Sequence, residues 1–449
     1  MTIAADRLLS VEEARALVLD ATPAPGDREV VDLSEAHGRV LAEDVTSLIA
    51  LPPWDNSAMD GYAIRAGDVA AASEDAPVRL QVIGEVRAGE PPQVAVEGGT
   101  AIRIATGAPI PPQADAVVQV ELTTPADATG APAGGRGRDA AGPIPAAVLV
   151  HAAVRDGTAI RRAGDDLPEA ALILRAGTTL SAAAVALAAG SGNATLAVHR
   201  RPRVGVLATG DEIRAGGRDL GPAGIPDANG PGLAALAWEA GAEARNLGIA
   251  RDRLEDVRER LTIAKHGDVD AVIVSGGVSV GPYDVVRAAF AEIGRIELWR
   301  VAVQPGKPFA FGVVDRPDGG RCLLFGLPGN PVSSFVTFEL FVRPALRKLA
   351  GHPADRLTRA TDRGVLLDRV TKGAGRRAFL RVVAVRDAAG AVERDADGRV
   401  RLHLAGGGRG QGSHVLSALA LAEALAIVPE SVDSLDAGSP VDLWWLDRD

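Results

Sequence analysis

Acidic residues stand beside glycines at several places in the sequence where an apolar run ends. One such run is followed by Thr209-Gly210-Asp211-Glu212, and another by Ser275-Gly276-Gly277-Val278-Ser279-Val280-Gly281-Pro282-Tyr283-Asp284. Glycine allows a ligand to approach the backbone, whose N–H groups can hold a phosphate. The two acids in the first loop would repel that phosphate unless a cation lay between them, and Mg²⁺ prefers carboxylate oxygens. The two loops together predict an anion site bridged by a divalent cation.

Four further segments carry the same mixture of polar, glycine and proline residues. They are Asp55-Asn56-Ser57-Ala58-Met59-Asp60-Gly61-Tyr62-Ala63, Thr106-Gly107-Ala108-Pro109, Gln304-Pro305-Gly306-Lys307-Pro308 and Gly326-Leu327-Pro328-Gly329-Asn330-Pro331. Ordinary structural interpretations are also available: Asp60-Gly61 is typical of a hairpin turn and Thr106 of a strand end, and in the loop at 275–284 Asp284 is typical of a helix cap. Prolines stiffen the last two loops, and Arg300 and Lys307 offer positive charge to an anion. Such loops grouped in one α/β region favour a built pocket over separate turns.

The familiar signatures of nucleotide and hydrolase sites do not occur in the sequence. The loop at 275–284 lacks the Gly-Lys-Ser/Thr of a P-loop and the G-x-G-x-x-G spacing of a dinucleotide fold. The histidines form no zinc-protease motif, and no Gly-x-Ser-x-Gly elbow is present, so we expect the histidines to lie at the surface or in structural positions. The one cysteine, Cys322, rules out an intramolecular disulfide, and its apolar neighbours predict a buried thiol.

Composition and charge limit the class of protein further. The chain has 449 residues, of which 47% are hydrophobic and 24% charged, and its formal net charge is −10. This length predicts about three or four domains. The acidic balance argues against a binder of nucleic acid or of a membrane surface, which needs a basic face. No uncharged apolar run of about 18 residues predicts a membrane span, and the first residues do not read as a signal peptide, so we expect a cytoplasmic protein.

Hydrophobic periodicity divides the chain into regions. Residues 10–45 read as helical and begin with a capping box at Ser10 and Glu13. Residues 51–150 alternate short strands with turns, and the low-complexity stretch 123–145 within them is predicted to be a loop. Residues 181–350 repeat the order strand, glycine loop, helix, which predicts a parallel sheet with a ligand beyond the carboxyl ends of its strands. The predicted strands of this sheet are 204–208, 243–249, 271–274 and 322–326. Residues 355–449 return to short strands, which fits either a small β-barrel or a sandwich.

Taken in order, the six loop segments resemble those of the MoeA-type molybdopterin molybdenumtransferases, a family that includes the gephyrin E-domain. The matching runs are Asp-Asn-Ser-Ala-Met-Asp-Gly-Tyr-Ala at 55–63, Thr-Gly-Ala-Pro at 106–109, Thr-Gly-Asp-Glu at 209–212, Ser-Gly-Gly-Val-Ser-Val-Gly at 275–281, Pro-Gly-Lys-Pro at 305–308 and Gly-Leu-Pro-Gly-Asn-Pro-Val-Ser at 326–333. They span nearly the whole chain. Six motifs in the same order are far more specific than any single glycine loop.

The resemblance implies the fold class α/β plus β. It implies an elongated multidomain chain with a parallel-sheet α/β molybdopterin-binding domain, an inserted β-domain and a C-terminal β-barrel-like domain. The implied boundaries are 1–50 with 150–180 for a split N-terminal dimerisation domain, 51–149 for the inserted domain, 181–350 for the α/β domain and 355–449 for the barrel. The family assembles as a homodimer with active sites between subunits, so the same is expected here.

The resemblance also implies the reaction. Adenylylated molybdopterin and molybdate would give molybdenum cofactor and AMP, with Mg²⁺ as the divalent cation. The positions that match the family's catalytic residues are Asp60, Thr106, Asp166, Glu212, Asp252 and Asp284. The metal ligands expected among them are Glu212, Asp252 and Asp284. From the loops and the resemblance together, the expected substrate-binding residues are Thr209, Gly210, Ser275, Gly276, Gly277, Ser279, Arg300, Lys307, Pro328, Gly329, Asn330, Pro331, Arg381 and Ser413. The expected partners are a second copy, other proteins of molybdenum cofactor biosynthesis and apo-molybdoenzymes, with neither nucleic acid nor membrane.

Two positions depart from the family pattern, and two other functions stay open. Gln304 stands where many relatives carry a lysine, which lowers the positive charge expected for anion binding, and Asp227-Ala228-Asn229 lacks the hydroxyl of the usual Asp-Thr/Ser-Asn. One alternative is an adenylyltransferase for molybdopterin, which shares the fold of 181–350 but usually occurs as a single domain. The other is a scaffold protein without catalysis, against which the retained acids Asp60, Glu212 and Asp284 argue.

Overall fold

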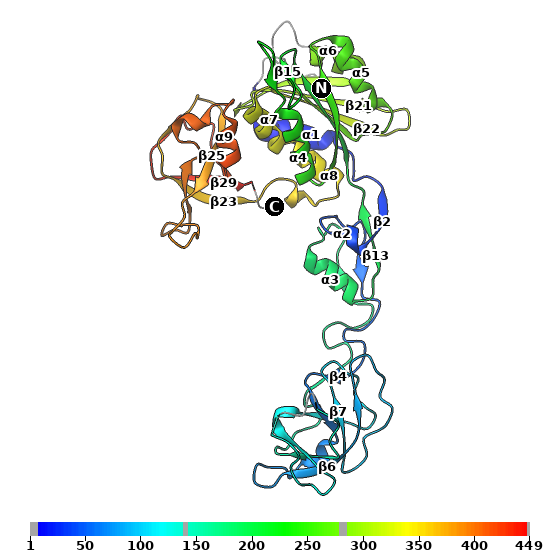
Figure 1. Ribbon diagram of the computed structural model, residues 1–449. Coiled ribbons are helices and arrows are strands. Elements are labelled where there is room, and N and C mark those ends of the chain that lie inside the picture. Colours follow the sequence, from blue (N-terminus) through cyan, green and yellow to red (C-terminus); the bar gives the residue numbers. More distant parts are fainter. Residues whose placement is uncertain (1–7, 138–141, 278–284, 447–449) are drawn as a thin grey trace. The chain divides into compact units, whose positions relative to one another are not determined.

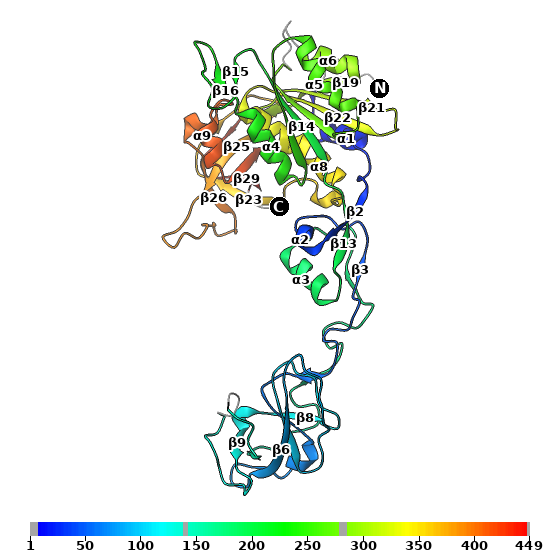
Figure 2. The same ribbon diagram turned by 45° about the vertical axis from the view of Figure 1, so that its right-hand side comes forward.

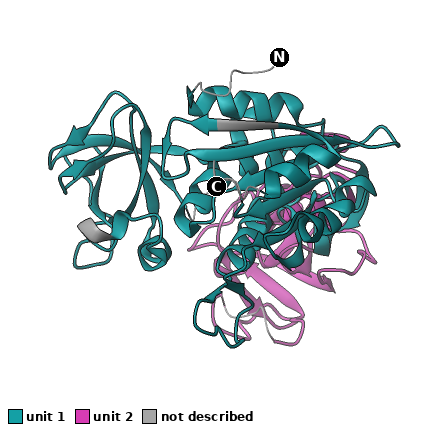
Figure 3. Cartoon of the chain, turned by 90° about the horizontal axis from the view of Figure 1, so that it is seen from above, with its two compact units in different colours: residues 1–43, 176–181, 197–449 teal, residues 44–175, 182–196 magenta. Residues whose placement is uncertain are grey.

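The computed structural model describes residues 8–137, 142–277 and 285–446. Two compact units make up the chain (Figure 3). Unit 1 comprises Met1–Glu43, Ala176–Ser181 and Ala197–Asp449, and unit 2 comprises Asp44–Arg175 and Ala182–Leu196. No helix in the described part of the chain is both long and apolar enough to cross a bilayer.

A mixed sheet of seven strands, counted over the described residues, forms the centre of unit 1 (Figure 2). Its order is β1 (Leu8–Leu9), β19 (Arg295–Val301), β21 (Pro308–Asp315), β22 (Arg321–Leu327), β18 (Ala271–Ser275), β14 (Arg203–Thr209) and β17 (Glu243–Ala250). The last four are parallel, as predicted. The sheet also has strands that were not predicted, and they make it mixed, because β21 runs antiparallel to both β19 and β22. A tight turn at 316–320 joins β21 to β22, and a short turn can join only antiparallel strands.

Helices cover both faces of this sheet. One face carries α1 (Val11–Ala21), α4 (Asn229–Glu239), α7 (Pro331–Thr337) and α8 (Arg343–Leu349), with a π-helix at Phe338–Val342 between the last two. The other face carries α5 (Leu254–Leu261) and α6 (Val285–Ile293). Side chains alternate along β22, so Leu323 and Phe325 enter the first core while Cys322 and Leu324 enter the second.

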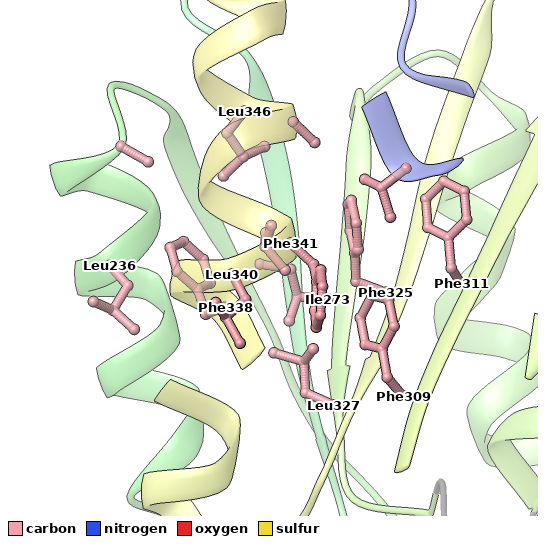
Figure 4. Packing of buried hydrophobic residues seen from close by; sticks show 14 of the residues in the cluster. Leu236, Ile273, Phe309, Phe311, Phe325, Leu327, Phe338, Leu340, Phe341 and Leu346 are labelled. Carbon is pink, nitrogen blue, oxygen red and sulfur yellow. The ribbon is translucent and has the colours of Figure 1, made fainter. Parts of the chain in front are cut away.

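Aromatic rings fill the first of these cores (Figure 4). The rings of Phe309 and Phe341 stack with their centroids 4.6 Å apart, and Phe325 lies beside Phe309. In the second core Cys322 is fully buried, as predicted, and burial raises the pKa of its thiol to about 12. The β14–β18–β22 strands are therefore held rigidly between two packed layers, and so are the loops at their ends.

The N-terminal segment begins as predicted and then departs from the helical interpretation. Ser10 and Glu13 form the capping box, with Ser10 N donating to Glu13 Oε2 at 2.9 Å and Glu13 N donating to Ser10 Oγ at 3.1 Å. The prediction of helix through residue 45 is wrong, because Pro23, Pro25 and Gly26 follow the end of α1. The elements that follow are β2 (Arg28–Asp32), α2 (Leu33–Ala36) and β3 (Val45–Thr46).

The C-terminal residues of unit 1 form a closed β-barrel. Its strands follow one another as β25 (Arg377–Ala384), β26 (Val400–Leu404), β23 (Thr361–Leu366), β29 (Ser439–Trp445) and β27 (Ala424–Val428), and β27 pairs again with β25. This closure selects the barrel over the sandwich. β20 (Val303–Gln304) pairs with β25 and connects the barrel to the loop that follows β19. The remaining barrel elements are β24 (Val370–Thr371), β28 (Ser434–Leu435) and α9 (Leu416–Leu421), the last of which is labelled in Figure 1.

Unit 2 is built on a second sheet. Its order is β8 (Ala116–Gln119), β5 (Gly61–Ile64), β7 (Thr100–Ile104), β6 (Val78–Val86), β10 (Ala147–Val150) and β9 (Thr123–Ala126). The prediction of a loop over 123–145 is wrong at its start, because 123–126 pairs with β10 as a strand. The shorter elements are β4 (Asn56–Ser57) with β11 (Ile160–Arg161), β12 (Leu172–Leu174) with β3, and α3 (Ala182–Gly190). β13 (Thr195–His199), most of which belongs to unit 1, pairs with β2 of that unit. The mixed α/β sheet, the β-unit and the barrel together give the α/β plus β class that was predicted.

Candidate functional site

A cavity of about 610 Å³ opens at the carboxyl ends of β14, β18 and β22. In a parallel α/β sheet this is the edge at which ligands bind. Each of the three strands runs into one of the predicted loops, and all three loops line the cavity. The structure brings together these predicted site residues: Thr209, Gly210, Glu212, Asp252, Ser275, Gly276, Gly277, Pro328, Gly329, Asn330 and Pro331.

Glycine allows the loops at the strand ends to come into contact. Gly276 has a φ of +95°, and a Cβ at this position would lie 2.7 Å from the carbonyl oxygen of Thr209. Its N–H donates to Leu327 O at 3.0 Å, and the N–H of Gly210 donates to Ala250 O at 3.2 Å. These two donors are used within the protein rather than offered to a phosphate. Glycine at 276 therefore serves the close approach of neighbouring strand ends.

Asn229, the first residue of α4, ties the loops to one another. Its Nδ2 donates to Ser275 Oγ and to Gly329 O, both at 2.7 Å. The hydroxyl of Thr209 donates to Ser275 O at 3.2 Å, so it too is part of this frame. The sequence drew attention to 227–229 only as a departure from the family pattern. The Asp-x-Asn pattern just before a predicted helix was the sequence feature that could have indicated this structural role of Asn229.

Carboxylates dominate the charge of the cavity. Glu212, Asp227 and Asp252 line it, and the described lining residues include no lysine or arginine. Burial raises the pKa of Asp252, and the negative charges of Asp211 and Glu212 raise it further. Negative charge gathered in this way without a counter-charge is the environment that a divalent cation neutralises.

The metal set expected from the sequence is only partly described. Glu212 and Asp252 line the same cavity, whereas Asp284, like Ser279 of the expected substrate loop, lies outside the described residues. No group of three or more His, Cys, Asp or Glu side chains placed to share a metal ion occurs within 8–137, 142–277 and 285–446.

The barrel contributes a loop to the same cavity. Ser413, an expected substrate residue, accepts a hydrogen bond at its Oγ from Asn330 Nδ2 at 3.2 Å, and its carbonyl accepts from Val332 N at 3.1 Å. His414 and Leu416 follow it and line the cavity. Sequence reasoning placed every histidine away from the site, so the position of His414 is a correction. The only sequence feature that could have indicated this position was the neighbouring Ser413, an expected substrate residue.

Arg381 is almost completely buried on β25, with 1% of its surface exposed. Its Nη2 donates to Gly410 O at 2.5 Å and to Gly412 O at 3.1 Å, which holds the loop that leads to Ser413. Its Nε finds no hydrogen-bond partner among the described residues. Burial lowers the pKa of the guanidinium to about 10. A buried cation without a nearby acid is costly, and a bound anion removes that cost.

The surroundings of Arg381 support this interpretation. A second cavity of about 150 Å³ lies beside it, and no Asp or Glu occurs among the described residues that line this cavity. Its polar lining consists of Gln304, Arg369, Thr371, Lys372, Arg381 and Gln411. The predicted cations Arg300 and Lys307 line neither cavity. Arg300 on β19 stands opposite Pro308 on β21, and Pro308 lines the larger cavity. Lys307 precedes Pro308 in the chain and is exposed.

The three remaining catalytic candidates lie in unit 2. Thr106 donates to Asp60 Oδ1 twice, from its backbone N at 2.7 Å and from its hydroxyl at 3.0 Å, so the predicted acid and hydroxyl form a pair. Asp166 is exposed, and its backbone N donates to Leu51 O at 3.0 Å. The structure shows no bond between Asp166 and the Asp60–Thr106 pair.

Comparison with known proteins covers most of the chain. Residues 9–192 match the MoeA N-terminal region (domain I and II), 205–348 a probable molybdopterin binding domain, and 363–446 the MoeA C-terminal region (domain IV). A molybdopterin molybdenumtransferase of Haemophilus influenzae is 32% identical over 435 residues, covering 97% of this chain and 98% of the relative. Molybdopterin molybdenumtransferase 1 of Mycobacterium tuberculosis is 34% identical over 455 residues, covering 97% and 99%. The crystal structure of a molybdopterin biosynthesis MoeA protein from Pyrococcus horikoshii superposes with a TM-score of 0.74 at 28% identity, covering 98% of this chain and 100% of that one.

Proposed function

Because the chain belongs to the MoeA family of molybdopterin molybdenumtransferases, we propose that its substrates are adenylylated molybdopterin and molybdate and that its products are molybdenum cofactor and AMP. Membership of the family makes the chain a transferase of molybdenum cofactor biosynthesis. Beyond this, we propose the adenylylated form of the pterin substrate, the divalent cation and the assembly. A cytoplasmic location is part of the same proposal.

One observation carries the proposal for the adenylylated substrate: the larger cavity holds three carboxylates and, in its described lining, no lysine or arginine. A pyrophosphate entering alone would be repelled by this charge, whereas a pyrophosphate with a divalent cation is accommodated. The cavity of about 610 Å³ lies within the usual range for a ligand of nucleotide size.

Mg²⁺ fits the donor set of the cavity. Glu212 and Asp252 would hold it, together with Asp284. Burial raises the pKa of Asp252, and the nearby charges of Asp211 and Glu212 raise it further, which supports a cation beside these acids. When bound, Mg²⁺ neutralises the phosphates and polarises the bond to be cleaved. The rest of the work falls to the chain itself: Asn229 fixes the loops, and Thr209 and Ser275 hold the strand ends at a constant separation. Among the described residues that line the cavity, no side chain lies in an environment that would activate it as a covalent nucleophile.

Molybdate is the second substrate, and the smaller cavity suits it. Arg381 lacks an acidic partner there, and Lys372 adds positive charge beside it, whereas the charge of Arg369 is paired with Asp436 at 3.6 Å. A tetrahedral dianion would supply the missing acceptor for Arg381 Nε. The loop held by Arg381 leads to Ser413, which accepts a hydrogen bond from Asn330 in the lining of the larger cavity, so the chain connects the two cavities. Arg300 and Lys307 keep the role of steering the anion by charge.

We further propose that two copies of the chain form a homodimer and that Asp60, Thr106 and Asp166 of one copy act at the cavity of the other. Unit 2 exposes large apolar side chains, which is typical of an interaction surface. They are Leu48 at 56%, Ile49 at 40%, Trp54 at 52% and Leu172 at 43% exposure. The proposal uses the domain scheme of the family, with 1–50 and 150–180 in dimerisation and 51–149 as the inserted domain.

The test of activity incubates purified protein with adenylylated molybdopterin, molybdate and Mg²⁺ and measures AMP release and molybdenum incorporation. Wild type releases AMP, and Asp252→Asn and Glu212→Gln do not, while Glu255→Gln, which removes an acid at the start of α5 outside the cavity, behaves as wild type. Binding without AMP release would establish the scaffold alternative. Formation of adenylylated molybdopterin from ATP would establish the adenylyltransferase.

The shared site is tested by mixing two inactive variants, Thr106→Ala and Asp252→Asn. If each site uses Asp60 and Thr106 from one copy and Asp252 from the other, mixed dimers regain one intact site, and equal mixing restores about a quarter of wild-type activity. No recovery after verified exchange of subunits would contradict a site built from two copies. A monomer in solution would contradict the assembly itself.

A further inference from the structure

A further cavity of about 610 Å³ lies within unit 1 and shares no described lining residue with the two cavities of the proposed reaction. Residues of α1 and of the barrel line it. Its charged lining residues are the arginines Arg15, Arg363, Arg377 and Arg399 and the acids Glu12 and Asp442. Positive charges therefore exceed negative charges by two in the described lining, although the formal net charge of the chain is −10.

The barrel presents a row of side chains from three neighbouring strands to this cavity. Arg363 on β23 stands opposite Asp442 on β29, which in turn stands opposite Ile427 on β27. Directly opposed residues of antiparallel strands point to the same face of a sheet. Two residues along that face, Trp444 is 6% exposed in the main core of unit 1, and its Nε1 donates to Thr361 Oγ1 at 3.2 Å. The packing of Trp444 therefore fixes the strands that carry the row.

α1 contributes Arg15 to the cavity. Val11, Ala14 and Val18 anchor the helix in the main core. The side chain of Arg15 is 19% exposed, and its nearest acidic atom, Glu12 Oε1, lies 3.9 Å away, beyond hydrogen-bond distance. Burial lowers the pKa of Arg15, and the negative charge of Glu12 opposes this without reversing it. Arg15 is thus a largely buried cation whose donors are not used by any described residue.

Two of the other arginines are already bound by acids of the protein. Arg377 contacts both carboxylate oxygens of Glu12, and its Nε donates to Glu430 Oε2 at 3.2 Å. Arg399 pairs with Asp397 at 2.6 Å. These two positive charges are neutralised without a ligand, and the pairing of Arg377 with Glu12 connects α1 to the barrel.

Arg363 resembles Arg15 rather than these two. It is exposed, and within the described residues its guanidinium makes neither a hydrogen bond nor an ion pair, even with Asp442 opposite. A guanidinium carries five N–H donors in a planar fork that matches a carboxylate or a phosphate. A long polyanion entering the cavity would also meet Glu12 and Asp442, so the arrangement of charge favours a small anion.

We propose that Arg15 and Arg363 bind a small organic dianion, a dicarboxylate or a phosphate monoester, whose oxygens accept hydrogen bonds from the two guanidiniums. Its carbon atoms lie against Ile427 and Pro429, which line the same cavity. An inorganic anion alone would leave most of the 610 Å³ unfilled and these apolar side chains uncovered. Because the cavity shares no lining residue with those of the proposed reaction, the dianion binds together with AMP and molybdate, as an effector and not as a substrate.

The test is titration calorimetry of the full chain with succinate and with glycerol 3-phosphate. AMP, Mg²⁺ and molybdate are present in excess to occupy the other two cavities, and the ionic strength is constant. Wild type binds at least one of the two dianions at one site per chain, with a dissociation constant below about 1 mM. The tighter of the two shows whether the site prefers carboxylate or phosphate.

Substitutions assign the binding to this cavity. Arg15→Met and Arg363→Met each weaken it at least about tenfold, because each removes charge-assisted hydrogen bonds, and the double variant removes it. Arg363→Lys keeps the charge and part of the affinity. Asp442→Asn strengthens binding several-fold, because it removes a negative charge from the lining. Arg321→Met, which alters an exposed arginine paired with Asp315 outside the cavity, binds as wild type does.

Four results would overturn the site. They are a wild type that binds neither dianion, an Arg15→Met, Arg363→Met double variant with unchanged affinity, an Arg321→Met variant that loses as much affinity as Arg363→Met, and uncharged dimethyl succinate binding as tightly as succinate. Thermal unfolding without ligand establishes that each variant is folded. Should Arg15→Met fail to fold, Arg363→Met and Arg363→Lys decide the matter, because Arg363 is exposed.

Discussion

Replacing Arg381 with methionine tests whether the buried guanidinium exists to bind an anion. Methionine retains much of the side-chain length and removes the charge and the donors. We expect Arg381→Met to be about as stable as wild type when no anion is present and to lose the stabilisation that molybdate gives to wild type. The expectation follows from two opposing contributions at this residue.

The first contribution is the cost of burying the charge. Burial lowers the pKa of Arg381 from its ordinary value to about 10, and at pH 7 the group is charged in both the folded and the unfolded chain, so the whole cost is present. At about 1.4 kcal/mol per pKa unit, the cost is about 3 kcal/mol. The second contribution is the pair of hydrogen bonds from Nη2 to Gly410 O and Gly412 O, which together stabilise by about 3 kcal/mol. The two nearly cancel, which leaves a net change within about 1 kcal/mol.

Urea unfolding followed by tryptophan fluorescence measures the change, because Trp444 and Trp445 lie on β29 of the barrel. Molybdate at about a hundred times its dissociation constant stabilises wild type by about 2.7 kcal/mol and leaves Arg381→Met unchanged. Arg381→Lys keeps the charge and retains part of the effect, and equal ionic strength of chloride is the control for salt. The reasoning is refuted if molybdate stabilises Arg381→Met as much as wild type. It is also refuted if the variant loses more than about 3 kcal/mol without anion, since the guanidinium would then be structural.

Three further substitutions or reactions test other parts of the site and its scaffold. Gly276→Ala places a Cβ 2.7 Å from Thr209 O at a φ of +95°, so it should destabilise the protein by about 2 kcal/mol or more and weaken AMP binding. A variant whose free energy of unfolding and AMP affinity equal those of wild type would contradict the close approach. The thiol of Cys322, with a pKa of about 12, should resist a disulfide reagent in the native protein and react after denaturation; rapid native labelling would show that it is accessible. The folded-state pKa of Asp252 lies above 3.8, so its ionised form destabilises the fold at neutral pH and this effect disappears as the pH falls below both the folded and unfolded values. Asp252→Asn should therefore be more stable than wild type at about pH 7, by a margin that shrinks toward about pH 4. A margin independent of pH would disprove the account.

The sequence predicted that the loops at the strand ends lie together, but it did not predict which residues surround them. Parallel strands end at the same edge of a sheet, so the loops after 204–208, 271–274 and 322–326 had to meet, and they do. The antiparallel strand at 308–315 was not predicted, because its apolar run is as compatible with a parallel strand and only the tight turn at 316–320 decides the direction.

Contributions from the barrel were harder to foresee for a different reason. His414 and Leu416 line the cavity because α9 packs against the main core, and this packing depends on residues far apart in the sequence. The state of Arg381 is likewise a product of tertiary structure: nothing adjacent to it in the sequence shows that the backbone at 410–412 covers the side chain. Local sequence patterns indicate turns and the periodicity of helices and strands, whereas the whole fold determines how far a charged side chain is removed from water.

Gln304 illustrates how this difference affects an inference about charge. From the sequence, glutamine in place of the usual lysine predicts less positive charge for anion binding. In the structure Gln304 lines the cavity beside Arg381, and its Oε1 accepts a hydrogen bond from Gly373 N at 3.4 Å. Lys372 lines the same cavity from the barrel, with its Nζ donating to Arg376 O at 2.6 Å. The positive charge missing at 304 is therefore present at 372, and because an anion responds to the summed field of a cavity, the substitution need not weaken binding. Gln304→Lys should accordingly change molybdate affinity less than Lys372→Met, and calorimetry of the two variants would contradict this if the order were reversed.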